Sequence, residues 1–310
     1  MKLSEIVSLY VFHKRALGHR FRSEEAILRS FCKVVGDGPI SIVDEETVWA
    51  FLNGNGPITV YWEKKHRVLS GLYRFAQARG LAKASPLPRT IPKPTIPAFV
   101  PYIYSHEELK RLLAAVPAAC SGRTPMEQEV FRTLLLLLYG TGLRIGEALR
   151  LTLGEVDLTK ACLRIRGTKF FKSRLVPMGR DLTGLLTDFV LRRYQVPSAD
   201  APLFSFRNGS PLSQSAVRST FRRLRSHAGV MRDGGPRRQP RIHDLRHTAA
   251  VHRLIAWYRS GKDLKDLLPQ LATYLGHVDL SSTQHYLTLT PELLQEASLR
   301  FEHYATGDHP

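Results

Sequence analysis

The most informative part of the 310-residue sequence is GTGLRIGE, residues 140–147. Two glycines end one predicted helix here, and Arg144 stands where the next helix begins. A helix start offers unpaired backbone N–H groups and a positive dipole end, so it favours anions. The guanidinium of Arg144 adds a planar fork that matches two phosphate oxygens. Glu147, one turn later, would orient that fork. The simpler alternative is a surface ion pair between the two residues.

The segment RIHDLRH, residues 241–247, carries a second cluster of functional groups. His243 and Arg246 lie three residues apart on one face of a predicted helix, so both could bind one phosphate. His243 and His247 also have the i and i+4 spacing of zinc ligands. However, Asp244 stands where the zinc-binding pattern has glutamate, and no cysteine partner is present. We therefore expect a phosphate site and no metal.

A histidine and a tyrosine follow at a fixed distance. Gly276 is predicted to end a helix over residues 264–275 and to present His277, and Tyr286 comes nine residues later. A phenol has a pKa near 10 and is a weak nucleophile unless cationic groups surround it. A capping histidine and a half-buried tyrosine are the ordinary alternatives.

Alternating apolar and polar residues over 161–166 and 173–177 predict a β-hairpin. Its tip, residues 167–172, carries Lys169 and Lys172. A lysine at a hairpin tip can reach into a DNA groove and protonate a leaving oxygen. The alternative is a turn with solvated charges.

Six prolines between residues 86 and 101 divide the chain. Proline at that density blocks helices and favours an extended spacer, so we predict a linker over 86–101 between domains at 1–85 and 102–310. The first domain is predicted to hold helices at about 3–17, from 23 through 31, from 44 through 51, and at about 60–79. Helices in the second are expected at about 105–116, 126–139, 145–151, 181–194, 213–228, 243–258, 264–275 and 291–305. The predicted fold class is mainly α, with a small β-hairpin or sheet.

The chain is strongly basic, with 45 Lys and Arg against 27 Asp and Glu and a net charge of +18. Both predicted domains share the excess, since 15 basic and 8 acidic residues precede position 101, and 30 and 19 follow position 100. This charge predicts an anionic partner, with nucleic acid ahead of a membrane or an acidic protein. No stretch approaches the roughly 20 apolar residues of a membrane span, and three scattered cysteines fit no disulfide framework. We therefore expect a DNA-binding protein of the reducing cytoplasm, with no membrane partner.

Basic residues gather at several places that are expected to meet DNA phosphates. Three arginines share one face of the predicted helix at 213–228, and four more occupy residues 232–241. The predicted DNA-binding residues are Lys64, Lys65, Arg67, Lys172, Arg174, Arg218, Arg222, Arg225, Arg237, Arg238 and Arg241. A solvated basic surface is the alternative.

In order and spacing, these motifs resemble the tyrosine recombinase family of the phage-integrase type, over nearly the whole chain. Residues 1–85 are similar to the family's helical, SAM-like core-binding domain, and residues 102–310 to its mixed α+β catalytic domain. The segment KSRLVP, residues 172–177, resembles the family pattern Lys-x-Arg-x-Val-Pro, which favours Lys169 as catalytic lysine and leaves Lys172 as the alternative. The resemblance implies the catalytic set Arg144, Lys169, His243, Arg246, His277 and Tyr286, with Glu147 supporting Arg144.

The resemblance also implies a site-specific DNA recombinase that needs neither metal nor ATP. Tyr286 would form a 3′-phosphotyrosine, and a 5′ hydroxyl of a second duplex would rejoin the strands. Four protomers would assemble on two double-stranded sites, with the helix at 291–305 docking in cis or on a neighbour. Similarity to transposon-borne and Xer-like members implies integration or excision of a mobile element, that is, transposition. Two alternatives remain open: a type IB topoisomerase-like enzyme, and a non-catalytic DNA-binding regulator on the same fold.

Overall fold

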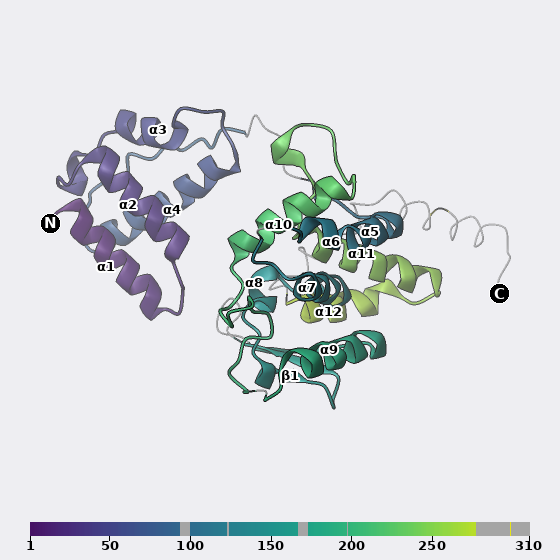
Figure 1. Ribbon diagram of the computed structural model, residues 1–310. Helices are drawn as coiled ribbons and strands as arrows, with labels where there is room; N and C mark the ends of the chain where they lie inside the picture. The colour runs from purple at the N-terminus through teal and green to yellow at the C-terminus, as the bar shows by residue number, and fades with distance from the viewer. Residues whose placement is uncertain (94–99, 123, 167–172, 197, 277–297, 299–310) are drawn as a thin grey trace. The chain divides into compact units, whose positions relative to one another are not determined.

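The computed structural model describes residues 1–93, 100–122, 124–166, 173–196, 198–276 and 298 (Figure 1). The described chain is mainly helical with one small antiparallel sheet, so the predicted fold class is confirmed. It divides into two compact units, Met1–Phe99 and Val100–Pro310.

The first unit is a bundle of four helices, all of which the sequence pattern predicted. They are α1 (Leu3–Ala16), α2 (Arg22–Val35), α3 (Glu45–Asn53) and α4 (Val60–Gln77), with a 3-10 turn at Ile40–Ile42. α1, α2 and α4 pack on one another, and α3 packs on α2 and α4. Asp44 caps α3, because its carboxylate accepts the Thr47 N–H at 2.7 Å. Leu28, Leu69 and Leu72 are fully buried in the core of this bundle.

The second unit contains the remaining helices and the sheet. Its described helices are α5 (His106–Ala114), α6 (Val116–Ala119), α7 (Gln128–Thr141), α8 (Ile145–Ala148), α9 (Arg180–Arg193), α10 (Gln214–His227), α11 (Asp244–Arg259) and α12 (Leu264–Leu275). 3-10 turns lie at Leu153–Glu155 and Pro236–Arg238. No helix in the described part of the chain is long and apolar enough to cross a membrane.

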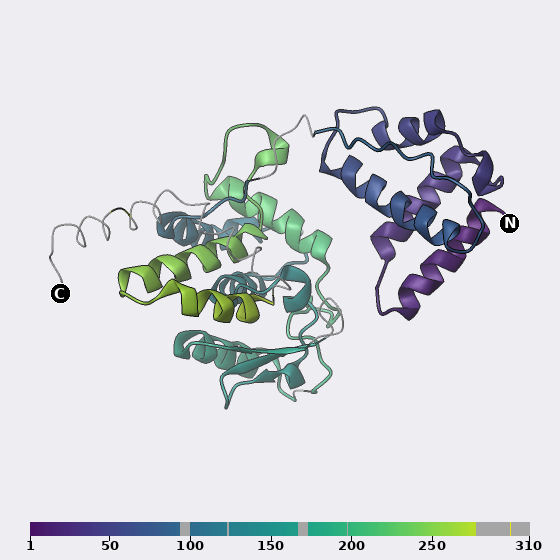
Figure 2. The same cartoon turned by 180° about the vertical axis from the view of Figure 1, so that it is seen from behind.

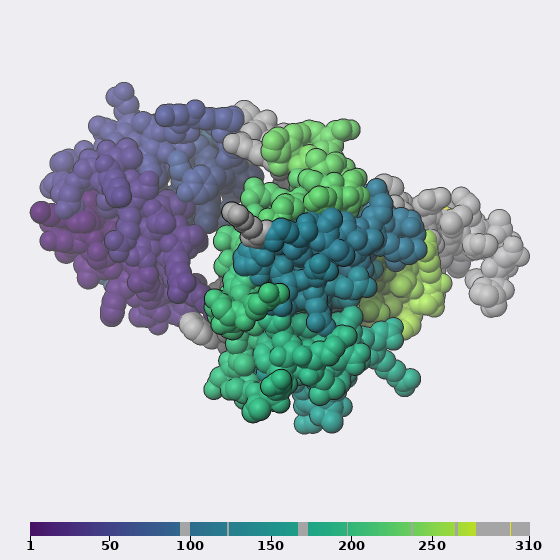
Figure 3. Space-filling model, in the orientation of Figure 1, coloured from purple at the N-terminus to yellow at the C-terminus, as the bar shows by residue number. Residues whose placement is uncertain are grey.

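α7 is the central helix of this unit. It packs against α6, α8, α9 and α11, and Figures 1 and 2 show it between α9 on one side and α11 on the other. This position explains the run of five leucines at 134–138, since a helix that is covered on several sides is apolar nearly all round. On the face seen in Figure 3, the blue-teal surface of α5 and α6 borders the green surface of α10, which packs on both.

The sheet has the order β1 (Val156–Asp157), β2 (Cys162–Ile165), β3 (Arg174–Pro177), with both pairs antiparallel. The register places Ile165 opposite Arg174. The hairpin of β2 and β3 was predicted, whereas β1 was missed because two residues show no alternation. β3 also packs against α12, which joins the sheet to the helical layer.

Candidate active site

The loop between α7 and α8 brings Arg144 to the start of a helix. Gly142 ends α7 in the left-handed region (φ +62°), and a Cβ there would lie 2.7 Å from Leu275 Cδ2. Glycine at this position therefore serves both the backbone turn and the packing. The Arg144 backbone N–H donates to Glu147 Oε2 and its Nη1 donates to Oε1, both at 3.0 Å. The carboxylate thus holds the backbone and the side chain of Arg144 together.

Glu147 also holds a second arginine, Arg174 of β3. Arg174 Nη2 donates to Oε2 at 2.9 Å and Nη1 to Oε1 at 3.2 Å, and the side chains are only 11% and 4% exposed, respectively. Burial alone would raise the pKa of Glu147. The hydrogen bonds and charge of Arg174, followed by the backbone N–H and charge of Arg144, outweigh this effect of burial and lower the pKa to about 2. The carboxylate is therefore ionised throughout the neutral range.

Three arginines from separate elements meet at the last turn of α12. The consecutive carbonyls of residues 274–276 each accept a hydrogen bond from a different guanidinium. The donors are Nε of Arg174 (3.0 Å to Tyr274), Nη2 of Arg246 (2.7 Å to Leu275) and Nη2 of Arg144 (3.0 Å to Gly276). Carbonyls at a helix C-terminus lack intrahelical partners and carry the negative dipole end, so cations are stabilised there. We call Arg144, Arg174 and Arg246 the arginine cap.

Arg246 links the α7–α8 loop to α12. Its Nη1 donates to Gly142 O at 2.7 Å, while its Nη2 holds Leu275 O, and the residue is only 3% exposed. Two charge-assisted hydrogen bonds to backbone carbonyls fix this buried guanidinium in one orientation. The loop that carries Arg144 and the end of α12 are consequently held against the same side chain of α11.

His243, the residue that precedes α11, lies within electrostatic reach of the cap. Burial is the main factor that lowers its pKa, and Arg246, Arg241 and Arg144 add to this effect against the opposing charge of Asp244. The imidazole is therefore favoured in its neutral form, which can accept a proton. Its ring contacts His247 edge to face, with centroids 5.1 Å apart.

The start of α11 is held by buried hydrogen bonds. Asp244 is fully buried and accepts from the backbone N–H and from Nη2 of Arg241, both at 2.8 Å. Thr248 Oγ1 donates to Asp244 O at 2.8 Å and accepts the Tyr104 N–H at 3.0 Å. These bonds fix the start of α11 and thereby the backbone position of His243.

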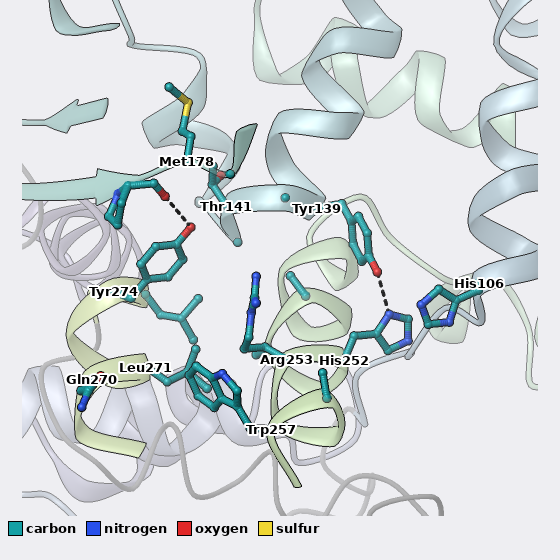
Figure 4. A pocket seen from close by; sticks show the side chains of 18 residues that line it. His106, Tyr139, Thr141, Met178, His252, Arg253, Trp257, Gln270, Leu271 and Tyr274 are labelled. Carbon is teal, nitrogen blue, oxygen red and sulfur yellow. Dashed lines mark hydrogen bonds between the residues drawn. The ribbon is translucent and has the colours of Figure 1, made fainter. Parts of the chain in front are cut away.

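A pocket of about 620 Å³ adjoins the cap and is lined by the end of α7, by Pro177 of β3 and by α11 and α12. Figure 4 shows Arg253 projecting between Tyr274 and Tyr139, and the Tyr139 hydroxyl in a 2.8 Å hydrogen bond with His252 Nδ1. The Tyr274 hydroxyl donates to Pro177 O at 3.2 Å (Figure 4). Tyr274 thus contacts β3 through both its hydroxyl and its backbone carbonyl, since the carbonyl accepts a hydrogen bond from Arg174 of the same strand.

Residues 103–292 match the family model for the phage integrase family. The chain belongs to the phage integrase family. It is 36% identical over 309 residues to the integrase/recombinase y4rB of Sinorhizobium fredii, covering 96% of each chain. It is 31% identical over 231 residues to the tyrosine recombinase XerD of Corynebacterium glutamicum, covering 74% of this chain and 70% of that one.

A solved structure of the Tn1549 transposon integrase with a circular intermediate DNA has the same fold. The TM-score is 0.71 at 16% sequence identity, over 97% of this chain and 99% of that one. Family membership and the shared fold make this chain a site-specific DNA recombinase of the tyrosine type, an enzyme, as the sequence motifs predicted.

The basic residues predicted to bind DNA in the first unit of this recombinase differ in their contacts. Lys65 Nζ donates to Phe51 O at 2.7 Å, at the end of α3, and lies 4.7 Å from the Phe51 ring centroid. Lys64 Nζ donates to Ser23 Oγ at 3.1 Å, and Arg67 forms an ion pair with Glu63 on α4. Arg67 is exposed, so of the three it has the side chain most accessible to a phosphate.

In the second unit, Arg218 and Arg222 are exposed on α10. Arg225 is half-buried and its Nη1 donates to Pro240 O at 2.9 Å. Arg238 is exposed in the 3-10 turn that also contains Arg237, and Arg241 holds Asp244 as described. The DNA contacts of all these residues stay predictions.

Part of the predicted catalytic set lies outside the described residues. Lys169, His277 and Tyr286 belong to this part. Lys172, the alternative catalytic lysine and a predicted DNA-binding residue, and the predicted helix at 291–305 lie there too. The structure brings together Arg144, Arg246, His243 and Glu147. Among the residues it describes, no group of three or more His, Cys, Asp or Glu side chains could hold a metal ion.

Sequence reasoning assigned Arg174 to DNA binding and did not foresee its place beside Glu147. All three guanidinium nitrogens of Arg174 donate to protein oxygens on α8 and α12. The available signal was its position in KSRLVP, on the strand side of the hairpin rather than at its tip.

Proposed function

We propose that this recombinase cuts and rejoins double-stranded DNA through a covalent 3′-phosphotyrosine on Tyr286, and that it integrates or excises a mobile element. One observation supports this most strongly. The guanidinium groups of Arg144 and Arg246 bind the consecutive carbonyls of Gly276 and Leu275, and His277 is the next residue in the sequence. Two arginine charges are thereby concentrated where they could bind a phosphate.

The cleavage step exchanges one phosphodiester for another. The Tyr286 oxygen attacks phosphorus and the bond to the 5′ oxygen breaks, which leaves a free 5′ hydroxyl. Arg144, Arg246 and His277 bind the nonbridging oxygens, where charge develops. Neutral His243 receives the tyrosine proton or bonds the phosphate, and Lys169 protonates the departing oxygen. Because a phosphodiester is conserved, the exchange requires neither metal nor ATP.

Recombination of two duplexes requires four strand cleavages, so we propose a homotetramer on two DNA sites. Residues 1–85 form a DNA-clamping domain, 86–101 a linker and 102–310 the catalytic domain. The helix at 291–305 docks on a neighbouring protomer. The matched Tn1549 integrase comes from a transposon, which favours mobile DNA as the substrate. The proposed place of action is the cytoplasm.

The test is covalent trapping in EDTA. Wild-type and Tyr286→Phe proteins are mixed with a library of nicked duplexes with a randomised core, denatured, captured and sequenced. We expect covalent DNA with the wild type and none with the variant, and the captured ends identify the site.

The same proteins separate the alternatives. A topoisomerase-like enzyme would relax supercoiled DNA and form no joint molecules between two duplexes. A folded wild type that binds DNA without covalent capture would indicate a regulator or a required partner, and would contradict the proposal. Undiminished capture by Tyr286→Phe would contradict the nucleophile assignment.

A further inference from the structure

Glu147 is shared by two arginines, and the sharing is unequal. Arg174 binds the carboxylate with both terminal nitrogens, at 2.9 and 3.2 Å, whereas Arg144 reaches it with one, at 3.0 Å. Arg144 is also the more exposed guanidinium, with 39% of its side chain accessible against 11% for Arg174. The buried arginine therefore contributes most of the charge that balances Glu147, and Arg144 stays accessible.

Arg174 is fitted to the end of α12 as well as to Glu147. Its Nε donates to Tyr274 O at 3.0 Å. The guanidinium faces Gly276 (φ +70°), where a Cβ would lie 2.7 Å from Arg174 Nη1 and 2.8 Å from Cζ. The guanidinium thus occupies the space that any other residue at 276 would fill. A lysine could make one of these contacts but not three.

The charges of this cluster determine what Arg144 can offer to a phosphate. With Arg174 in place, two guanidinium groups and one carboxylate leave a net positive charge. Without it, the buried carboxylate has Arg144 as its remaining partner in the cluster, so the pair would be neutral. Interactions between buried charges are poorly screened, so this difference reaches a bound phosphate strongly.

We propose that Arg174 is a positioning residue for strand cleavage, which holds Glu147 and the end of α12 so that Arg144 keeps its charge for the scissile phosphate. This inference rests on the proposed function, in which Arg144 binds that phosphate. Arg174 itself touches protein atoms with every guanidinium nitrogen, so its effect passes through Glu147 and through Gly276.

The experiment measures single-turnover cleavage of the nicked duplex found by covalent trapping, in EDTA, with the dissociation constant for the same DNA measured alongside. The variants are Arg174→Gln, Arg174→Lys and the double variant Glu147→Gln/Arg174→Gln. Arg192→Gln is the matched control, because Arg192 pairs with Glu129 at 3.0 Å on an exposed surface. All rates are measured well below the melting temperatures and normalised to the folded fraction.

We expect Arg174→Gln to cleave about tenfold more slowly or worse, with unchanged DNA affinity. Arg174→Lys should fall between this variant and the wild type, because it keeps the charge and loses the geometry. The double variant should cleave faster than Arg174→Gln, because the Glu147 carboxylate no longer neutralises the charge of Arg144. Because the rates are normalised to the folded fraction, a loss of folding in Arg174→Gln could not by itself explain a faster rate in the double variant.

Two results overturn the inference: a wild-type rate in Arg174→Gln, or a double variant no faster than the single one. If Arg174→Gln does not fold, a wild-type rate in Arg174→Lys overturns it. The proposed function fails differently, by absence of wild-type covalent complex or by full activity of Arg144→Ala. Normal cleavage by Arg174→Gln beside an inactive Arg144→Ala removes only the inference.

Discussion

The hydroxyl of Tyr104 donates a 2.8 Å hydrogen bond to the carbonyl of Arg241, across 137 residues of sequence. Tyr104 is fully buried, and the loop it holds leads directly into His243. We expect Tyr104→Phe to lower the free energy of unfolding by about 1 kcal/mol, because one buried carbonyl loses its donor. Cleavage should slow while DNA affinity is kept. Urea unfolding and the covalent-capture rate measure the two effects, and unchanged values for both would contradict this function of Tyr104.

Gly276→Ala should lower stability by more than the strain of a positive φ alone would, and should also slow cleavage. The substitution strains a positive φ, at a cost of about 1–2 kcal/mol, and pushes a methyl group into the Arg174 guanidinium. Gly209→Ala is the matched control, since Gly209 has a φ of +80° with nothing within 4 Å of the added Cβ. We expect thermal unfolding to show a larger loss at 276 and cleavage to fall there alone. Equal losses at both positions would count against the close contact with Arg174.

Glu147 should make stability depend on pH at the acid end. Its pKa is about 2 in the folded protein against 4.5 for the free side chain, so its contribution is complete above pH 4.5. The contribution is lost as the pH falls from 4.5 toward 2. The difference in unfolding free energy between wild type and Glu147→Gln should therefore be constant near neutrality and narrow below pH 4.5. Urea titrations at several pH values measure this difference in unfolding free energy. A difference that grows on acidification would contradict the lowered pKa of Glu147.

Lys65 and Arg67 lie two residues apart on α4 and should behave differently. Lys65 binds the carbonyl end of α3, so Lys65→Met should cost about 1 kcal/mol of stability and leave the salt dependence of DNA binding unchanged. Arg67→Met should cost little, because its ion pair is exposed, and should lower the salt slope by about one unit. Binding isotherms at several salt concentrations distinguish them. A reduced slope for Lys65→Met would restore Lys65 as a DNA contact.

A similar contrast is expected on α10. Arg218→Ala and Arg222→Ala should each weaken DNA binding and reduce the salt slope by about one unit, because both side chains are exposed. Arg225→Ala should chiefly lower stability, since its guanidinium holds Pro240 O. Chemical unfolding and salt-dependent binding of the three variants give the comparison. If Arg218→Ala and Arg222→Ala bind like the wild type, α10 does not meet the DNA.

Local signals predicted most of the fold. Asp44 and Ser105 cap α3 and α5 because short-range hydrogen bonds favour those ends, and Gly142 ends α7 because it adopts a left-handed turn. Periodicity located the helices within a few residues. β1 was missed, since its two residues pair with β2 only through tertiary contacts.

The candidate site was predicted as a set of residues but not as a set of contacts. The pairing of Arg144 with Glu147 follows from their spacing on one helix turn. The bonds of Arg174 to Glu147 and Tyr274 join positions 27 and 100 residues apart, and no local pattern encodes them. The charge of Arg174 alone suggested DNA, because sequence reveals the charge and not the burial.

The three bonds at the end of α12 also determine when the site can exist. They join residues 144, 174 and 246 to residues 276, 274 and 275, over separations of 132, 100 and 29 positions. A chain still under synthesis has its first two arginines exposed to solvent long before the carbonyls that orient them have been made. Contacts between residues so far apart in the sequence form late in folding, and domains fold as units. The nascent polypeptide can therefore associate with nucleic acid through its charge, while the arrangement proposed to cut strands awaits the last turn of α12.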